Sequence, residues 1–174
     1  MKKTIAVLLA ALPVALFSAC RAEERPPEAE EAAPVVAEMH AVANPEGALE
    51  EIYAGIDIKE IEPADDQLME SLGFDLWDIE EYAVRYSSGR YGLADVFILR
   101  PHVNDYDSVR ESLETVKLDR IRKTEEYDVL GSHRIAEEAQ IYQYGSYLIM
   151  LMLEDNSAAA EIVQRYIPST EVSG

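Results

Sequence analysis

The spacing of apolar residues changes its period along the chain, and these changes predict the order of the secondary-structure elements. Two short stretches come first, residues 45–53 and 65–72, in which apolar side chains recur every three or four positions, as on one face of a helix. An aspartate, Asp65 or Asp66, is placed to cap the second stretch, and Gly73 is placed to end it. We therefore expect two short helices before the first long strand.

The middle of the chain predicts a hairpin followed by a long helix. Residues 82–86 and 94–99 are rich in β-branched and aromatic residues, and residues 87–92 between them form a loop with two glycines. The helix is expected over residues 107–127, with a capping box at Ser108–Glu111. Its expected inward stripe is Val109, Leu113, Val116 and Ile121.

A second hairpin gives the clearest local pattern. Residues 141–144 and 147–153 flank a Gly145-Ser146 turn, and glycine in the first turn position favours a type II′ connection. This turn would pair Tyr144 with Tyr147 and Tyr142 with Ile149. A last helix should begin at an Asp155–Ser157 cap and end before Pro168.

Strand–strand–helix thus occurs twice, after the short helices. This order predicts an α+β fold with a four-stranded antiparallel sheet and helices mainly on one face. The last strand is apolar at every position from 148 to 153, so it should be an interior strand. One of its faces is then either a binding surface or covered by the first short helices.

The N-terminus has the order of a secretory signal peptide. Lys2 and Lys3 precede an apolar run over residues 5–17, which is too short to span a bilayer, and Cys20 is the only cysteine. With Ser18-Ala19 before it, Cys20 matches the position that the bacterial lipoprotein pathway modifies with diacylglycerol. We expect lipidation at Cys20 and a cell-membrane location facing the extracytoplasmic side.

Two other cleavage positions fit less well. Ordinary signal peptidase prefers small residues at the last and third-last positions before the cut, and a cut after Ala19 would place Phe17 at the third-last position. A cut after Ala22 would place Cys20 and Arg21 inside the recognition site. The lipobox itself has Phe17 where leucine is commoner.

Changes in composition divide the chain into four parts. Residues 1–19 are the expected signal peptide, 20–45 an acidic Pro/Glu/Ala-rich tether, 46–168 one α+β domain and 169–174 a tail. The alternative for the tether is that Val35, Val36 and Met39 dock on the domain.

The formal net charge of −19 narrows the possible partners. Nucleic-acid binding requires a basic surface, so a nucleic-acid partner is excluded. Anionic lipid headgroups would repel the domain, so the lipid anchor must hold it at the membrane. A single cysteine also leaves no internal disulfide, and stability must come from an ordinary core.

Residues 48–167 resemble a group of uncharacterised Gram-positive (Firmicutes-type) lipoproteins classed as a domain of unknown function. The resemblance depends on the lipobox with its acidic linker, on Leu72-Gly73-Phe74 leading into Asp78–Tyr82 and Val84–Gly89, and on Tyr144–Tyr147 before an aliphatic strand. It implies an anchored extracytoplasmic domain and supplies no catalytic residue.

Candidate chemistry is sparse. His40, His102 and His133 are far apart in the sequence, and none has a second ligand at metal spacing. The acidic pairs Asp65–Asp66 and Asp105/Asp107 precede helices, where capping explains them, and Ser87–Gly89 is an ordinary turn sequence. We expect no catalytic residue, no metal site and no cofactor.

Tyrosine is the enriched aromatic residue, with ten against three phenylalanines. The ordinary interpretation is amphipathic side chains on half-exposed strands. The functional one is a surface for an envelope protein or a cell-wall glycan, formed by Tyr86, Tyr91, Tyr142, Tyr144 and Tyr147. The sequence favours a non-enzymatic binding domain; the alternative is a small envelope enzyme or enzyme inhibitor with its site at the hairpin loops.

Overall fold

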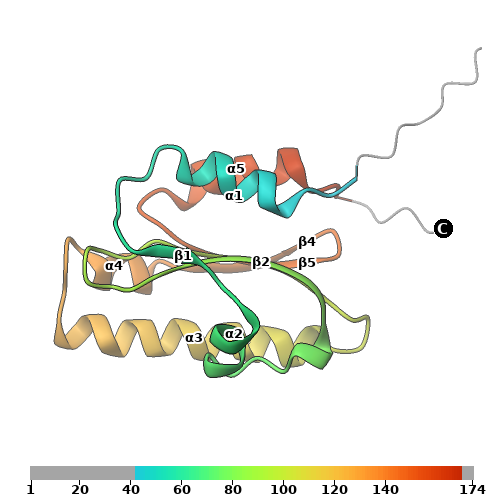
Figure 1. The fold of residues 1–174 in the computed structure, drawn as a ribbon, viewed down its shortest axis with the longest axis horizontal. Coiled ribbons are helices and arrows are strands. Elements are labelled where there is room, and N and C mark those ends of the chain that lie inside the picture. Colours follow the sequence, from blue (N-terminus) through green and yellow to red (C-terminus); the bar gives the residue numbers. More distant parts are fainter. Residues whose placement is uncertain (1–41, 170–174) are drawn as a thin grey trace, which may run out of the picture. The chain divides into compact units, whose positions relative to one another are not determined.

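All six side chains of the strand β5 (Tyr147–Met152) are buried, and the rest of the fold is arranged around this strand. The computed structural model describes residues 42–169. In it β5 belongs to a five-stranded antiparallel sheet with the strand order β1-β2-β3-β5-β4 (Figure 1). The other strands are β1 (Ile61–Pro63), β2 (Ile79–Ser87), β3 (Asp95–Pro101) and β4 (Gln140–Tyr144).

Helices cover both faces of this sheet. On one face α1 (Pro45–Tyr53) and α5 (Asn156–Tyr166) lie side by side (Figure 1). On the other face lie α2 (Asp66–Ser71), the 3₁₀ helix η1 (Leu76–Asp78), α3 (Tyr106–Glu126) and α4 (Ser132–Glu137). The expected α+β class is confirmed, with two layers of helices where the sequence indicated mainly one.

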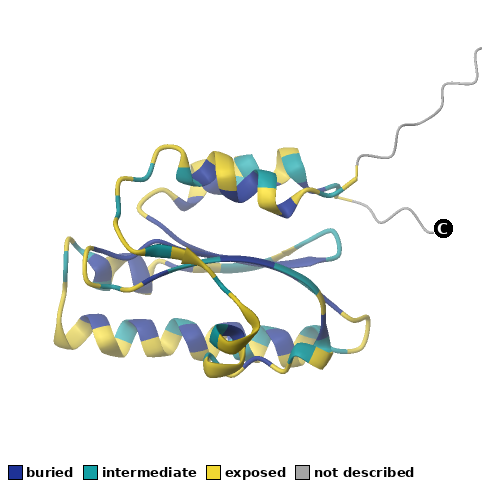
Figure 2. Ribbon diagram, in the orientation of Figure 1, coloured by how far each residue is buried: buried dark blue, intermediate teal, exposed yellow. Residues whose placement is uncertain are grey.

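Two apolar cores result, one on each side of the sheet. Leu148, Met150 and Met152 face α2, α3 and α4, and the alternate residues Tyr147, Ile149 and Leu151 face α1 and α5. Figure 2 shows the buried strands between the two helical layers. Of the two alternatives for the second face of β5, cover by a short N-terminal helix is therefore the one observed, and α5 completes that cover.

The three short elements that the sequence did not predict are β1, η1 and α4. β1 adds a fifth strand at the edge, pairing Ile61 with Ser87, and three residues are too few to show alternation. α4 begins after Gly131, whose φ of 76° places it in the left-handed region.

The capping box predicted at Ser108 is wrong. α3 spans Tyr106–Glu126 and its N-cap is Asp105, three residues before the predicted cap. The Ser108 hydroxyl instead donates to the Asp78 carboxylate at 2.6 Å. A long-range partner has replaced the local one, and a sequence pattern cannot show this. Val109, Leu113 and Val116 are buried as expected, and Ile121 is half-buried.

The second hairpin has the predicted register. Tyr144 pairs with Tyr147 and Tyr142 with Ile149. Gly145 has a φ of +56°, as a type II′ turn requires, and it also packs so closely on the Pro168 carbonyl that a Cβ would lie 2.4 Å from that oxygen. Glycine is needed here on both grounds.

The described part of the chain has two distinct ends. At the terminal end, the Asn44 amide donates to the Tyr166 carbonyl at 2.9 Å, so the beginning of α1 lies beside the end of α5. Asp95 pairs with Met152 and Leu99 with Leu148, so the loop 88–94 and the end of β5 lie at the opposite end from the turn at Gly145. We call that opposite end the distal end. Cys20 and the rest of the expected signal peptide and tether up to residue 41 lie outside the described residues, as do residues 170–174.

Candidate binding groove at the distal end

An apolar groove lies at the distal end, where α1 stops and α5 starts. It consists of two neighbouring cavities of about 260 and 220 Å³ that share Ile56, Leu153 and Glu154 in their walls. We call this feature the distal groove. Its aliphatic lining residues are Ile52, Ile56, Ile58, Leu93, Leu130, Ile135, Leu153 and Ile162.

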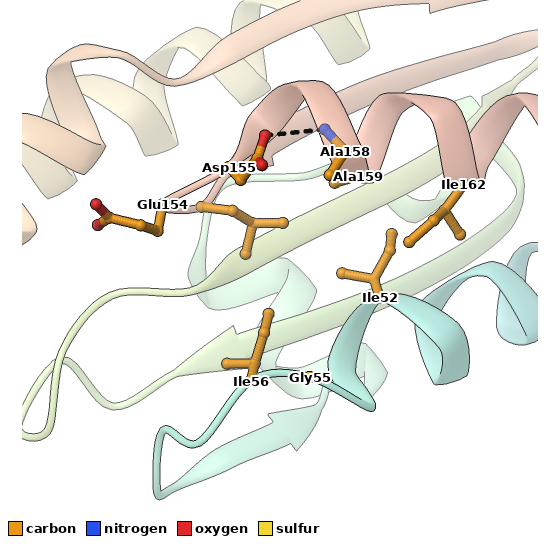
Figure 3. A pocket seen from close by; sticks show the side chains of 9 residues that line it. Ile52, Gly55, Ile56, Glu154, Asp155, Ala158, Ala159 and Ile162 are labelled. Carbon is orange, nitrogen blue, oxygen red and sulfur yellow. Dashed lines mark hydrogen bonds between the residues drawn. The ribbon is translucent and has the colours of Figure 1, made fainter.

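The first cavity lies between the two helices of one face. Ile52 is in the last turn of α1, and Ile162 is in the second turn of α5; Figure 3 shows the two side chains pointing toward the same hollow. Ile56 reaches it from the loop after α1. The apolar faces of both helices thus contribute aliphatic side chains to the wall of this cavity.

The second cavity is built by loops. Gly92 has a φ of +119°, and a Cβ placed there would lie 3.4 Å from Ile58 and 3.8 Å from Leu130. Leu130 itself has a φ of +54°, a left-handed conformation that non-glycine residues rarely adopt, and its residue is 79% exposed. The structure thus holds a large aliphatic side chain at the mouth of the groove in an unfavourable backbone conformation.

Carboxylates lie in the wall of the groove and on residues next to it in the sequence. Glu154 and Asp155 belong to its wall, and Figure 3 shows the Glu154 carboxylate pointing away from the isoleucines. Asp57 lies between two lining isoleucines, and Glu161 is one turn beyond Ala158 on α5; both are exposed. Glu154 is bound by Arg134 at 2.7 Å, whereas Asp57 and Glu161 form no ion pair with any described residue.

A buried ion pair fixes the loop under the groove. Arg120 of α3 donates from Nε to Asp95 Oδ2 at 2.7 Å and from Nη2 to the Ser87 carbonyl at 2.6 Å. Ser87 in turn donates to Asp95 from its amide and its hydroxyl, both at 2.7 Å. Burial raises the pKa of the Asp95 carboxyl, and the Arg120 charge and the Ser87 donors oppose that rise. Both ends of the loop 88–94 are therefore held to α3.

Two further hydrogen bonds position the walls. The Tyr53 hydroxyl donates to the Ala94 carbonyl at 2.9 Å, which joins the end of α1 to the start of β3, and burial raises the pKa of this phenol. The Asn156 side chain accepts from the Leu153 amide and donates to the Glu138 carbonyl, both at 3.0 Å. The groove is thus supported on both sides by polar contacts within the fold.

The five tyrosines singled out in the sequence do not form one surface. Tyr86 belongs to the α3 face, where the Arg120 guanidinium lies 3.8 Å from the centre of its ring, and Tyr91 is 44% exposed in the distal loop. Tyr142, Tyr144 and Tyr147 share the α1/α5 face, as expected, but Tyr147 is buried and donates to Glu81 at 2.7 Å. Their role in partner binding stays a prediction.

The other candidate residues are also dispersed. His102 pairs with Glu80 near the terminal end, His133 contacts Thr124 at 3.3 Å near the distal end, and His40 lies outside the described residues. Within residues 42–169, no group of three His, Cys, Asp or Glu side chains is arranged to hold a metal ion. No helix in that range has the length and apolar character needed to cross a membrane.

The sequence predicted neither the groove nor the buried ion pair of Arg120 and Asp95. Ile56, Ile58 and Leu130 are apolar residues in loops, outside every periodic stretch, and this isolation is the one indication that could have singled them out. No such indication existed for Arg120, because it is one of many charged residues in a long helix and its sequence position resembles that of a solvent-exposed arginine.

Comparison with known proteins identifies the family and nothing closer. No curated protein and no solved structure matches the chain. One family model, described as Domain of unknown function (DUF4358), matches residues 50–153. That range includes β1 to β5, α2, η1, α3, α4 and the last turn of α1, and so the whole sheet. The chain belongs to the DUF4358 family.

Proposed function

We propose that this protein is a lipid-anchored binding domain of the cell envelope, attached through Cys20 and acting through the distal groove. Cys20 is the only thiol of the chain, and it follows a basic and then an apolar segment in the order of a lipoprotein signal peptide. Lipidation there would place residues 42–169 on the extracytoplasmic side of the membrane.

The position of the groove is the observation that best supports a binding role. A tether from Cys20 would join the domain at Asn44, at the terminal end, whereas the groove opens at the distal end. Residues 20–43, if extended, could span tens of Å. An anchored domain would therefore present its groove away from its own attachment point.

The charge of the chain also supports a lipid anchor. The full chain has a formal net charge of −19, which opposes contact with anionic headgroups, so the protein needs a covalent lipid to stay at the membrane. A single acyl chain anchors only weakly, and the two chains of a diacylglycerol give stable attachment. The proposed enzymatic alternative, with one site at both hairpin loops, has less support because those loops lie at opposite ends of the sheet.

Metabolic labelling tests the proposal. Cells expressing the full chain would be grown with an alkyne analogue of palmitate and separated into membrane and soluble fractions. We expect label and protein together in the membrane fraction for the wild type and for the matched control His40→Ala. Cys20→Ser should lose the label; a wild-type chain without label, or a Cys20→Ser chain that keeps it, would overturn the proposal.

A further inference from the structure

We propose that the distal groove binds a cationic amphipathic peptide segment of a partner protein. This proposal rests on the proposed function in one respect, the location: the anchored domain would meet its partner protein on the extracytoplasmic side of the membrane. The binding chemistry itself depends only on the floor of the groove and on its rim, which can be tested separately from the anchor.

The floor suits aliphatic side chains. Ile52, Ile56 and Ile162 line one cavity, and Ile58 and Leu130 line the next, so the apolar surface continues across both. Apolar grooves between helices accept the apolar face of an amphipathic helix, with anchors spaced three or four residues apart. The two adjoining cavities offer places for successive anchors.

Leu130 supports a functional interpretation of this surface. A left-handed conformation is unfavourable for a residue with a side chain, and Leu130 adopts it with a φ of +54°. The side chain recovers little of that cost by burial, because the residue is 79% exposed. Strain of this kind persists where surrounding structure enforces it, and such positions cluster at ligand-binding sites.

The rim selects the charge of the partner. Glu154 and Asp155 line the groove, and Asp57 and Glu161 are exposed residues next in the sequence to the lining residues Ile56, Ile58 and Ile162. Glu154 pairs with Arg134, Asp155 accepts from the Ala158 amide at 2.9 Å, and Asp57 and Glu161 form no ion pair with any described residue. The nearby Lys59 lies 5.9 Å from the centre of the Tyr91 ring. Carboxylates around an apolar pocket favour a segment in which lysine or arginine flanks the apolar anchors, because the charges attract at long range and suppress acidic competitors.

The same charges disfavour the other occupants. Residues 21–41 of the chain have more glutamates than basic residues, so the rim would repel them. A second copy would bring the same acidic rim against the first. An anionic bilayer would be repelled for the same reason. A cationic peptide is the occupant that matches both the floor and the rim.

Fluorescence anisotropy with three designed peptides tests this. The protein would be residues 20–174 with Cys20→Ser, which removes the acyl chain and keeps the whole domain and tether. The probes are a labelled amphipathic helix of leucine and lysine, the same helix with glutamate for lysine, and a reshuffled leucine–lysine peptide without an apolar face. We expect the first to bind, more weakly as salt rises, and the other two to bind at least about tenfold more weakly.

Matched variants locate the site. Asp57→Lys with Glu161→Lys should weaken the leucine–lysine peptide about tenfold or more, whereas Glu111→Lys with Glu114→Lys on α3 makes the same change of charge on the other face. Leu130→Ser should weaken binding to a similar degree, and its control is Leu118→Ser, an exposed leucine of α3. Both leucines are exposed, so both variants should keep the wild-type unfolding midpoint.

Several results would overturn the inference. They are no binding of the leucine–lysine peptide, equal binding of the glutamate peptide, or equal losses in the groove and α3 variants. Sedimentation showing a dimer that Leu130→Ser dissolves would assign the groove to a second copy. Vesicle binding that depends on Leu130 would assign it to lipid. None of these results bears on palmitate labelling of Cys20, so the two proposals can fail independently.

Discussion

Arg120 lies with its Nε 2.7 Å from Asp95 Oδ2 inside the core, and both residues are buried, Arg120 at 5% exposure and Asp95 at 0%. The pair joins α3 to the start of β3. Both oxygens of the carboxylate are in use, since Ser87 donates twice to Oδ1. A buried ion pair of this kind is costly to break, because each partner alone leaves an uncompensated buried charge.

Removing one partner should therefore destabilise the domain strongly. Arg120→Met is expected to lower the free energy of unfolding by about 3–5 kcal/mol, and Asp95→Asn by a comparable amount. Urea unfolding followed by circular dichroism measures both. The double variant should recover a large part of the loss, because it removes both charges. Arg134→Met, which breaks the exposed pair with Glu154, is the control and should cost less than about 1 kcal/mol.

Two tyrosines of the same sheet face should respond in opposite directions to loss of the hydroxyl. The Tyr142 hydroxyl is buried without a hydrogen-bond partner among residues 42–169, and the Tyr147 hydroxyl donates to Glu81. Tyr142→Phe should raise the free energy of unfolding by about 1 kcal/mol, since an unpaired buried hydroxyl is removed. Tyr147→Phe should lower it by about 1 kcal/mol. Equal effects in chemical denaturation would contradict this assignment.

The free energy of unfolding should fall at alkaline pH, because two tyrosines ionise less readily in the folded chain than in the unfolded chain. Burial raises the pKa of Tyr142 to about 12, and burial with the hydrogen bond to Asp66 raises that of Tyr82 to about 12, against 10.0 for a free phenol. Between these values the unfolded chain releases protons that the folded chain keeps, so stability falls as pH rises from about 10. Below pH 10 these two groups contribute no pH dependence.

The melting temperature between pH 9 and pH 11.5 tests this, with phenolate absorbance recorded in parallel. We expect the melting temperature to fall through that range and Tyr142→Phe to make the fall shallower. Tyr127→Phe is the control, because Tyr127 is 75% exposed, and its curve should follow the wild type. A wild-type melting temperature that is flat to pH 11.5 would show that the phenols of Tyr142 and Tyr82 do not resist ionisation.

The central strand offers a direct test of the two-core architecture. Ile149 and Met150 of β5 point to opposite faces, and each is fully buried. Ile149→Asp and Met150→Asp should each cost several kcal/mol, enough to unfold a marginally stable domain. Gln143→Asp, at an exposed residue of β4, should have little effect. If Ile149→Asp stays folded by circular dichroism, α1 and α5 do not cover that face as described.

Sequence periodicity predicted the elements that contact their neighbours in the chain. The run of residues 148–153 and the Gly145-Ser146 turn each specify a local structure, and the register that they predict is the one observed. The placing of α1 beside α5 was not predictable in this way. Their contacts, such as the Arg165–Glu51 ion pair, join residues more than a hundred positions apart, and no local pattern encodes them.

The groove was harder to predict for a related reason. Leu130 and Ile58 belong to loops, where the spacing of apolar residues has no period to interpret. Arg120 has a helical position like that of any solvated arginine, and only the packing of α3 on β2 and β3 shows that it is buried. Features that depend on tertiary contacts of single residues therefore became visible only in the structure.

The most direct test of an anchored domain with an outward-facing groove is thiol labelling on intact cells. Lipidation converts the Cys20 sulfur to a thioether, so a full chain carrying Ser157→Cys would have one reactive thiol, on an exposed residue of α5 next to Ala158 of the groove wall. We predict that a membrane-impermeant maleimide labels this chain on intact cells and that the labelled protein stays with the membrane. Labelling only after lysis, or a second thiol that reacts in the denatured protein, would contradict the account.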